Sequence, residues 1–84
     1  MSKYEKQLQQ VLRGTSDTNI LFNDLCQLLL RLGFEERVRG SHHVFRKAGV
    51  EARINLQKDG DKAKAYQVRQ VRDVLISYEL GEEL

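Results

Sequence analysis

The chain has little of what a disulfide-bonded or membrane-spanning protein requires. It contains one cysteine, no proline and no tryptophan, and no apolar run is longer than three residues. A single cysteine cannot close an intrachain disulfide, and three apolar residues cannot cross a bilayer. Because the first residues do not have the pattern of a signal peptide either, we expect a cytoplasmic protein with no membrane partner.

The sequence also lacks the usual spacings of metal ligands. Its two histidines, His42 and His43, are adjacent, and it has no CxxC or HxxxH motif and no carboxylate cluster suited to two Mg²⁺ ions. The cysteine, Cys26, lies within an apolar helical pattern, which is typical of a buried thiol. We therefore predict no metal site, no small-molecule cofactor and no metal-dependent nuclease chemistry.

Length and charge limit the kind of partner. A chain of 84 residues has room for one small domain, so we treat residues 1–84 as a single domain whose ligand binds on the surface or in a shallow cleft. The formal net charge is only +2, but residues 31–72 carry eleven Lys and Arg against five acidic residues. Such a surface favours a polyanion, most commonly nucleic acid, and a solvated basic face without a partner is the alternative.

Apolar residues at helical spacing predict three helices. The first covers residues 3–13, and the second has its apolar face at Leu25, Leu28, Leu29 and Leu32 and ends at Gly33. Phe34 is expected to pack back on the last turn of this second helix. The third helix covers about residues 65–79 and carries arginines on its outer side.

Between the second and third helices the apolar period changes to two. This predicts three strands at residues 34–39, 42–47 and 50–56, joined by tight hairpin turns, and then a polar loop over residues 57–62. Two helices can cover one face of a three-stranded antiparallel sheet and leave the other face exposed. We therefore expect an α+β two-layer architecture.

The segment Gly40–Lys47 concentrates the chemistry of the chain. It begins with a Gly-Ser turn, continues with both histidines and ends with Arg46 and Lys47. A histidine can transfer a proton near neutral pH, and Arg and Lys can hold a phosphate. The backbone N–H groups of the turn and the hydroxyl of Ser41 can stabilise an oxyanion.

The two histidines are expected to face opposite sides of the sheet, because successive strand residues alternate. If Phe45 is buried, His43 turns inward with it and His42 is exposed together with Arg46. If Val44 is buried instead, the assignment reverses. Phenylalanine buries more area than valine, so we favour an exposed His42.

Four segments of the sequence also match a known pattern: Gly33-Phe34, Arg39-Gly40-Ser41-His42-His43-Val44-Phe45-Arg46, Asn55-Leu56-Gln57 and Tyr66-Gln67-Val68-Arg69-Gln70-Val71-Arg72. Together they resemble the HicA family, the toxin component of HicA/HicB toxin-antitoxin pairs. This resemblance implies an αβββα fold like the double-stranded RNA-binding domain, here over residues 19–80. The helix and turn predicted over residues 1–18 are additional to the compact members of the family. The resemblance also implies a type II toxin that cleaves mRNA independently of translation and is inhibited when a HicB antitoxin covers its active site.

Matched residue by residue, the catalytic histidine of the family falls on His42 and its turn glycine on Gly40. RNA supplies its own nucleophile, the 2′-hydroxyl, so we expect a metal-independent endoribonuclease in which His42 acts as base or proton shuttle. Gly40 and Ser41 would serve as oxyanion donors. We predict RNA or phosphate contacts for a further set of basic residues: Arg39, His43, Arg46, Lys47, Lys62, Lys64, Arg69 and Arg72.

Two other functions stay open at this point. One is a non-catalytic RNA-binding module of the same fold, which binds RNA without cleaving it. The other is a protein-interaction domain whose basic face meets an acidic partner. Comparing RNA cleavage by the parent protein and by His42→Ala distinguishes the enzyme from the non-catalytic RNA-binding module. Measuring RNA affinity distinguishes these two functions from the protein-interaction domain.

Overall fold

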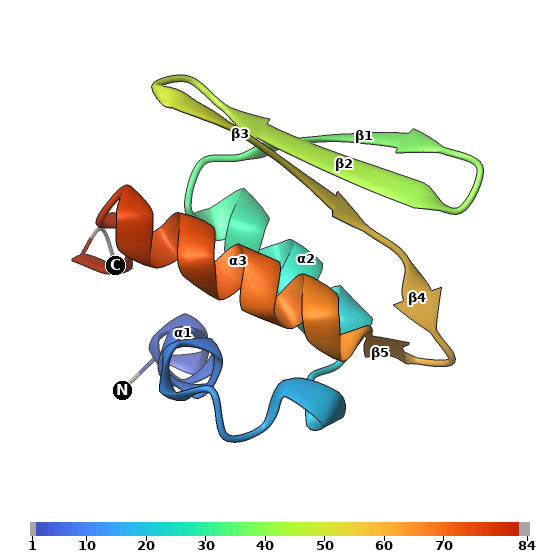
Figure 1. Cartoon of the computed structure of the whole chain (residues 1–84), viewed down its shortest axis with the longest axis horizontal. Helices are drawn as coiled ribbons and strands as arrows, with labels where there is room; N and C mark the ends of the chain where they lie inside the picture. The colour runs from blue at the N-terminus through green and yellow to red at the C-terminus, as the bar shows by residue number, and fades with distance from the viewer. Residues whose placement is uncertain (1, 83–84) are drawn as a thin grey trace.

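The computed structural model describes residues 2–82 of the chain (Figure 1). Its main helices and strands are α1 (Lys3–Arg13), α2 (Phe22–Arg31), β1 (Glu35–Arg39), β2 (His42–Lys47), β3 (Val50–Leu56) and α3 (Ala65–Ser77). The shorter elements are η1 (Asp17–Asn19), β4 (Lys58–Asp59), β5 (Lys62–Ala63) and η2 (Leu80–Glu82). The predicted ranges of the first and third helices and of the three strands agree with the observed ranges to within two residues, and the second helix ends before Gly33 as predicted.

The elements form an α+β fold in which the helices lie on one side of the sheet. The antiparallel sheet has the order β1-β2-β3, and both α2 and α3 lie against the same face of it (Figure 1). From α2 onward, the chain therefore has the αβββα order of the double-stranded RNA-binding domain. The additional helix α1 packs on the side of α2 and α3 that is remote from the sheet (Figure 1), so the outer face of the sheet is left uncovered.

The end of α2 is fixed by a glycine, as the sequence predicted. Gly33 has a φ of +97°, and its N–H donates to the carbonyl of Leu30 at 3.1 Å. The N–H of Phe34 donates to the carbonyl of Leu29 at 3.0 Å, and the Phe34 side chain is buried. This pair of hydrogen bonds is the Schellman motif, which turns the chain out of the helix and into β1.

The prediction of a polar loop over residues 57–62 is wrong, because β4 and β5 form a small hairpin there. The N–H of Ala63 donates to the carbonyl of Ile20 at 2.9 Å, and the N–H of Phe22 donates to the carbonyl of Asp61 at 3.0 Å. These bonds join the hairpin to the segment that precedes α2. They are made across about forty residues of sequence, which is why the local composition predicted only a turn.

The prediction that Arg72 lies on the outer side of α3 is also wrong. Its guanidinium donates two hydrogen bonds to the Asp17 carboxylate, at 2.9 and 3.0 Å, and a third to the carbonyl of Val11 at 3.1 Å. The Asp17 hydrogen bond raises the pKa of Arg72 above its ordinary value, so the guanidinium is charged at neutral pH. Arg72 therefore joins α3 to α1 and η1 instead of facing solvent.

Among the described residues, no helix has the length and apolar content needed to cross a membrane.

Candidate functional site

The register of the sheet decides which histidine is exposed. Phe45 pairs with Ile54, both are fully buried, and both face the helices. His43 shares this inner face, and His42 therefore points to the outer face. The expected arrangement, with Phe45 and His43 inward and His42 outward, is confirmed.

His42 is held by two amide side chains from the end of β3. Its Nδ1 lies 3.2 Å from Oδ1 of Asn55, and its Nε2 lies 3.3 Å from Nε2 of Gln57. An amide oxygen can only accept and an amide nitrogen can only donate, so Nδ1 carries the proton and Nε2 accepts. In this network Nε2 of His42 accepts a hydrogen bond from Gln57 on the exposed face of the sheet.

The same glutamine connects the turn and the hairpin to the histidine. Nε2 of Gln57 donates to the Ser41 hydroxyl at 3.3 Å, and Nζ of Lys64 donates to Oε1 of Gln57 at 3.4 Å. The backbone N–H of Gln57 donates to Oε1 of Gln67, which is only 3% exposed, at 3.0 Å. A buried glutamine of α3 thus fixes the backbone at the point where β3 leaves the sheet.

The turn between β1 and β2 requires its glycine for conformation and not for space. Gly40 has a φ of +58°, and an added Cβ would meet no atom within 4 Å. A non-glycine residue rarely adopts this φ, so Gly40 sets the path of the turn into β2. Ser41 and His42 follow it directly in the sequence, and both lie within hydrogen-bond distance of Nε2 of Gln57.

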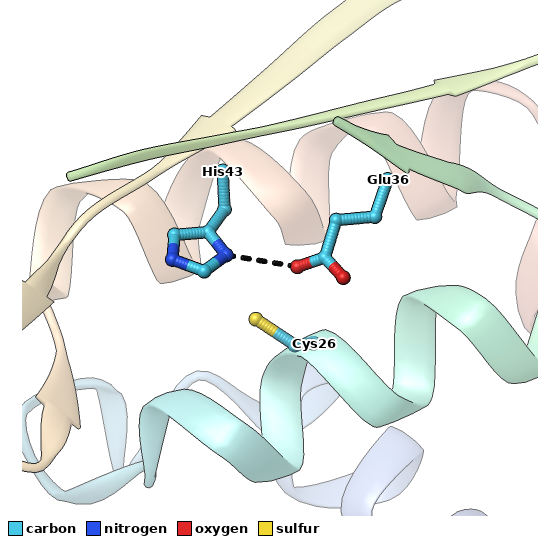
Figure 2. A group of neighbouring side chains, drawn as sticks. All are labelled: Cys26, Glu36 and His43. Atoms are coloured by element: carbon cyan, nitrogen blue, oxygen red, sulfur yellow. Dashed lines mark hydrogen bonds and ion pairs between the residues drawn. The ribbon is translucent and has the colours of Figure 1, made fainter. Parts of the chain in front are cut away.

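His43 belongs to a different environment below the sheet. Its Nδ1 lies 2.9 Å from a carboxylate oxygen of Glu36, and its ring packs edge-on against Phe22 with the centroids 4.8 Å apart. Figure 2 shows Cys26 pointing from α2 toward this pair. His43 thus lies between sheet and helix, on the face opposite to His42.

Cys26, Glu36 and His43 are also the residues that could hold a metal ion in the described part of the chain. One ligand atom from each lies within 4.8 Å of the others (Figure 2). However, burial and, to a smaller extent, the Glu36 carboxylate raise the pKa of the Cys26 thiol to about 12, while Lys58 lowers it. A metal requires a thiolate, and His43 already bonds to Glu36, so the absence of a metal site stays a prediction.

Four arginines lie on the outer face of the sheet, beside His42. Arg39 pairs with His42 in the register, and the other three follow along the strands. They line a hollow of about 390 Å³ together with one acidic and one apolar residue; the lining is Glu35, Arg37, Arg39, Val44, Arg46 and Arg53. The predicted Arg39 and Arg46 are therefore on the histidine's face, and Arg37 and Arg53 join them.

The other predicted basic residues are distributed over the molecule. Lys47 faces the helices, and its Nζ donates to the carbonyl of Leu32 at the end of α2, at 2.8 Å. Lys62 is half-buried in β5, which lies against the segment before α2. Lys64 reaches the His42 network through Gln57, and Arg69 is exposed on α3.

The sequence interpretation missed Asn55, Gln57 and Gln67 as parts of the site. All three lie in segments that carried the family resemblance, but no role was assigned to them. The strand alternation that exposes Arg53 also exposes Asn55 and could have placed it opposite Val44. The contact between Gln57 and Gln67 depends on how α3 packs and has no local signal.

Comparison with known proteins gives one family match. A family model described as the HicA toxin of bacterial toxin-antitoxin systems matches residues 22–75, which is more than half of the chain and includes the sheet, its turn and most of α3. No curated protein and no solved structure gives a significant match.

Proposed function

Because the chain belongs to the HicA toxin family of bacterial toxin-antitoxin systems, we propose that it is a metal-independent endoribonuclease that cleaves mRNA through His42. The observation that carries this proposal is the fixed orientation of the His42 imidazole on the exposed face of the sheet. Oδ1 of Asn55 lies within hydrogen-bond distance of Nδ1, and Nε2 of Gln57 lies within hydrogen-bond distance of the imidazole Nε2. Once Gln57 gives way to RNA, Nε2 of His42 can act as a general base.

The reaction follows from groups close to that nitrogen. Nε2 of His42 removes the proton of a ribose 2′-hydroxyl, and the 2′-oxygen attacks the adjacent phosphorus. The bond from phosphorus to the 5′-oxygen breaks, and this oxygen takes a proton from the imidazolium or from water. The products are a 2′,3′-cyclic phosphate and a 5′-hydroxyl, with no metal in any step.

The charge that develops on the phosphate requires donors. Arg39, which is opposite His42 in the sheet, supplies a fixed positive charge, and the Gly40-Ser41 turn supplies N–H and hydroxyl groups. Release of the Nε2 hydrogen bond by Gln57 would free the amide of Gln57 to donate to a phosphate oxygen. Lys64 lies behind this amide and adds a second positive charge.

An antitoxin partner follows from the family, and we take a HicB-type protein to be that partner. The support is the exposure of His42, whose face of the sheet no described element covers (Figure 1). A protein that covered this face would block the base directly.

The experiment compares the purified parent protein with His42→Ala on an mRNA in the presence of EDTA. We expect the parent to yield 2′,3′-cyclic phosphate ends and the variant to be slower by roughly a hundredfold to ten-thousandfold, because the base is lost. RNA binding by the variant should be retained. His43→Gln is the matched control, since it faces the helices and should lower thermal stability far more than it lowers cleavage.

The alternative function gives a different set of results. If the folded parent binds RNA but cleaves none, and His42→Ala weakens binding, the protein is a binding module of the same fold. Cleavage that stops in EDTA and returns with Mg²⁺ would contradict the metal-independent mechanism.

A further inference from the structure

The hollow on the outer face of the sheet is lined mainly by positively charged side chains. Four of its six lining residues are arginines, and Glu35 is the one acidic residue among them. All four arginines are exposed, and in the described part of the chain none of them forms an ion pair. Arginines packed this closely repel one another, so the free protein gains nothing from the arrangement.

The composition of the hollow fits nucleic acid better than protein. Strong protein interfaces depend on a buried aromatic or aliphatic anchor, and the hollow offers only the half-buried Val44. Guanidinium groups bind phosphate through two parallel hydrogen bonds and also stack on bases. Val44 would provide the apolar floor on which a base can rest.

The position of the hollow relates it to the proposed site. Arg39 is opposite His42, Arg37 is opposite Val44, and Arg46 is opposite Glu35, so the arginines extend away from the histidine along the strands. Arg46 lies four residue steps along β2 from His42, a span of about 13 Å. An RNA strand that crosses the hollow would therefore continue directly from a phosphate held at His42.

Resting on the proposed ribonuclease function, we infer that this hollow binds the single-stranded RNA next to the cleavage site, with Arg37 and Arg53 as phosphate contacts in addition to Arg39 and Arg46. The hollow is shallow and lies on a sheet face, which suits one strand with its bases turned toward the protein. The helix α3 is not the principal RNA contact, because Arg72 is already bound to Asp17 and Val11.

The test uses a variant that removes Arg37 and Arg53 from the hollow, Arg37→Gln/Arg53→Gln, and a control that removes two exposed charges from α1, Lys6→Gln/Arg13→Gln. The α1 charges lie on the opposite side of the molecule from the sheet (Figure 1). The variant and the control each also carry His42→Ala, so that the short single-stranded RNA of mixed sequence used as the ligand is not cleaved. Affinity is measured over a range of salt concentrations.

We expect the sheet variant to bind RNA roughly tenfold more weakly, with a salt slope shallower by about 1.4, because each lost phosphate contact removes about 0.7. The α1 control should bind within about twofold of its parent. In the background with His42 restored, the sheet variant should raise KM more than it lowers kcat. Equal losses in both variants would mean a general charge effect and would overturn the inference.

Two further outcomes separate this inference from the proposed function. If the parent protein cleaves no RNA but its RNA affinity depends on Arg37 and Arg53, the hollow is an RNA-binding site and the proposed nuclease function is wrong. Unchanged RNA affinity together with a loss of antitoxin binding would assign the hollow to the protein partner and overturn the inference. Equal thermal stability of the variants confirms that both are folded.

Discussion

Cys26 is a residue whose chemistry is changed strongly by the fold. Its side chain is 6% exposed on α2, facing the inner side of the sheet where Glu36 and His43 lie. Burial, with a smaller contribution from Glu36, raises the pKa of its thiol from 9.0 to about 12, although Lys58 acts in the opposite direction. The thiol is therefore protonated at neutral pH and is neither a nucleophile nor a ready metal ligand.

This raised pKa predicts a loss of stability in alkali. Below pH 9 the thiol is protonated in both the folded and the unfolded chain, so its contribution is constant. Between pH 9.0 and about 12 the unfolded chain releases the proton and the folded chain keeps it, so the free energy of unfolding falls as the pH rises. Chemical denaturation at about pH 8 and pH 10 should show a smaller alkaline loss for Cys26→Ala than for the parent.

The contribution of Cys26 is obtained as a difference, because the lysines and tyrosines of the chain also titrate in this range. They are common to both proteins and cancel in the comparison. If parent and variant lose the same stability between the two pH values, the thiol is not buried in the way described. A thiol reagent gives a second measure, since the native thiol should react about a thousandfold more slowly than the unfolded one.

At the scale of elements, α3 has two arginines with different roles one helical turn apart. Arg69 is exposed, whereas Arg72 bonds to Asp17 with both side chains less than a fifth exposed. The close approach also explains Gly14, where an added Cβ would lie 2.9 Å from a nitrogen of Arg72. Arg72 is thus a structural residue that holds α1, η1 and α3 together.

This difference predicts opposite results for two similar substitutions. Arg72→Met should lower the free energy of unfolding by about 2 kcal/mol, because it leaves Asp17 largely buried without its partner. RNA affinity should change less than twofold. Arg69→Gln should leave stability within about 0.5 kcal/mol and weaken RNA binding if this side of α3 contributes to it.

A second variant checks the cause of the Arg72 effect. Replacing both partners, as in Asp17→Leu/Arg72→Met, should recover much of the lost stability, because no buried charge is left unpaired. Denaturation of the four proteins of this cycle gives the coupling energy. A double variant as unstable as the sum of the single ones would show that the pair is not coupled.

The elements themselves could be predicted from the sequence because their signals are local. The change of apolar period after Gly33 and the cleanly alternating third strand indicated where strands replace helices, and Phe45 decided the exposed face. The Asp17–Arg72 pair, the β4–β5 hairpin and the Gln57–Gln67 contact could not be predicted. Each depends on residues brought together from distant parts of the chain, and an exposed and a buried arginine look the same in a helical pattern.

At the scale of the whole molecule, α1 is an α-helix that lies entirely outside the family match. The match begins at residue 22, yet α1 contributes Leu8 and Val11 to the core and presents the Val11 carbonyl to Arg72. The radius of gyration of 11.6 Å is close to the roughly 12 Å expected of one folded domain of this length. The helix is therefore an integral part of the packing and lies remote from the outer face of the sheet.

This arrangement predicts that α1 affects stability and not chemistry. Leu8→Ala should lower the free energy of unfolding by about 2 to 4 kcal/mol, because it removes a side chain that is only 4% exposed and leaves a cavity. Below its unfolding temperature, the variant should cleave RNA at the rate of the parent. The control is Ile76→Ala, whose side chain is 59% exposed and whose loss should cost less than about 0.5 kcal/mol.

The combination of the two readouts decides what the additional helix does. A folded Leu8→Ala protein that has lost cleavage would mean that α1 shapes the site, either through α3 and Gln67 or by direct contact with RNA. A loss of stability without a loss of rate would identify α1 as an added layer of core. In that case the catalytic unit is the αβββα part, and α1 supplies packing against α2 and α3 and keeps Asp17 and Arg72 out of solvent.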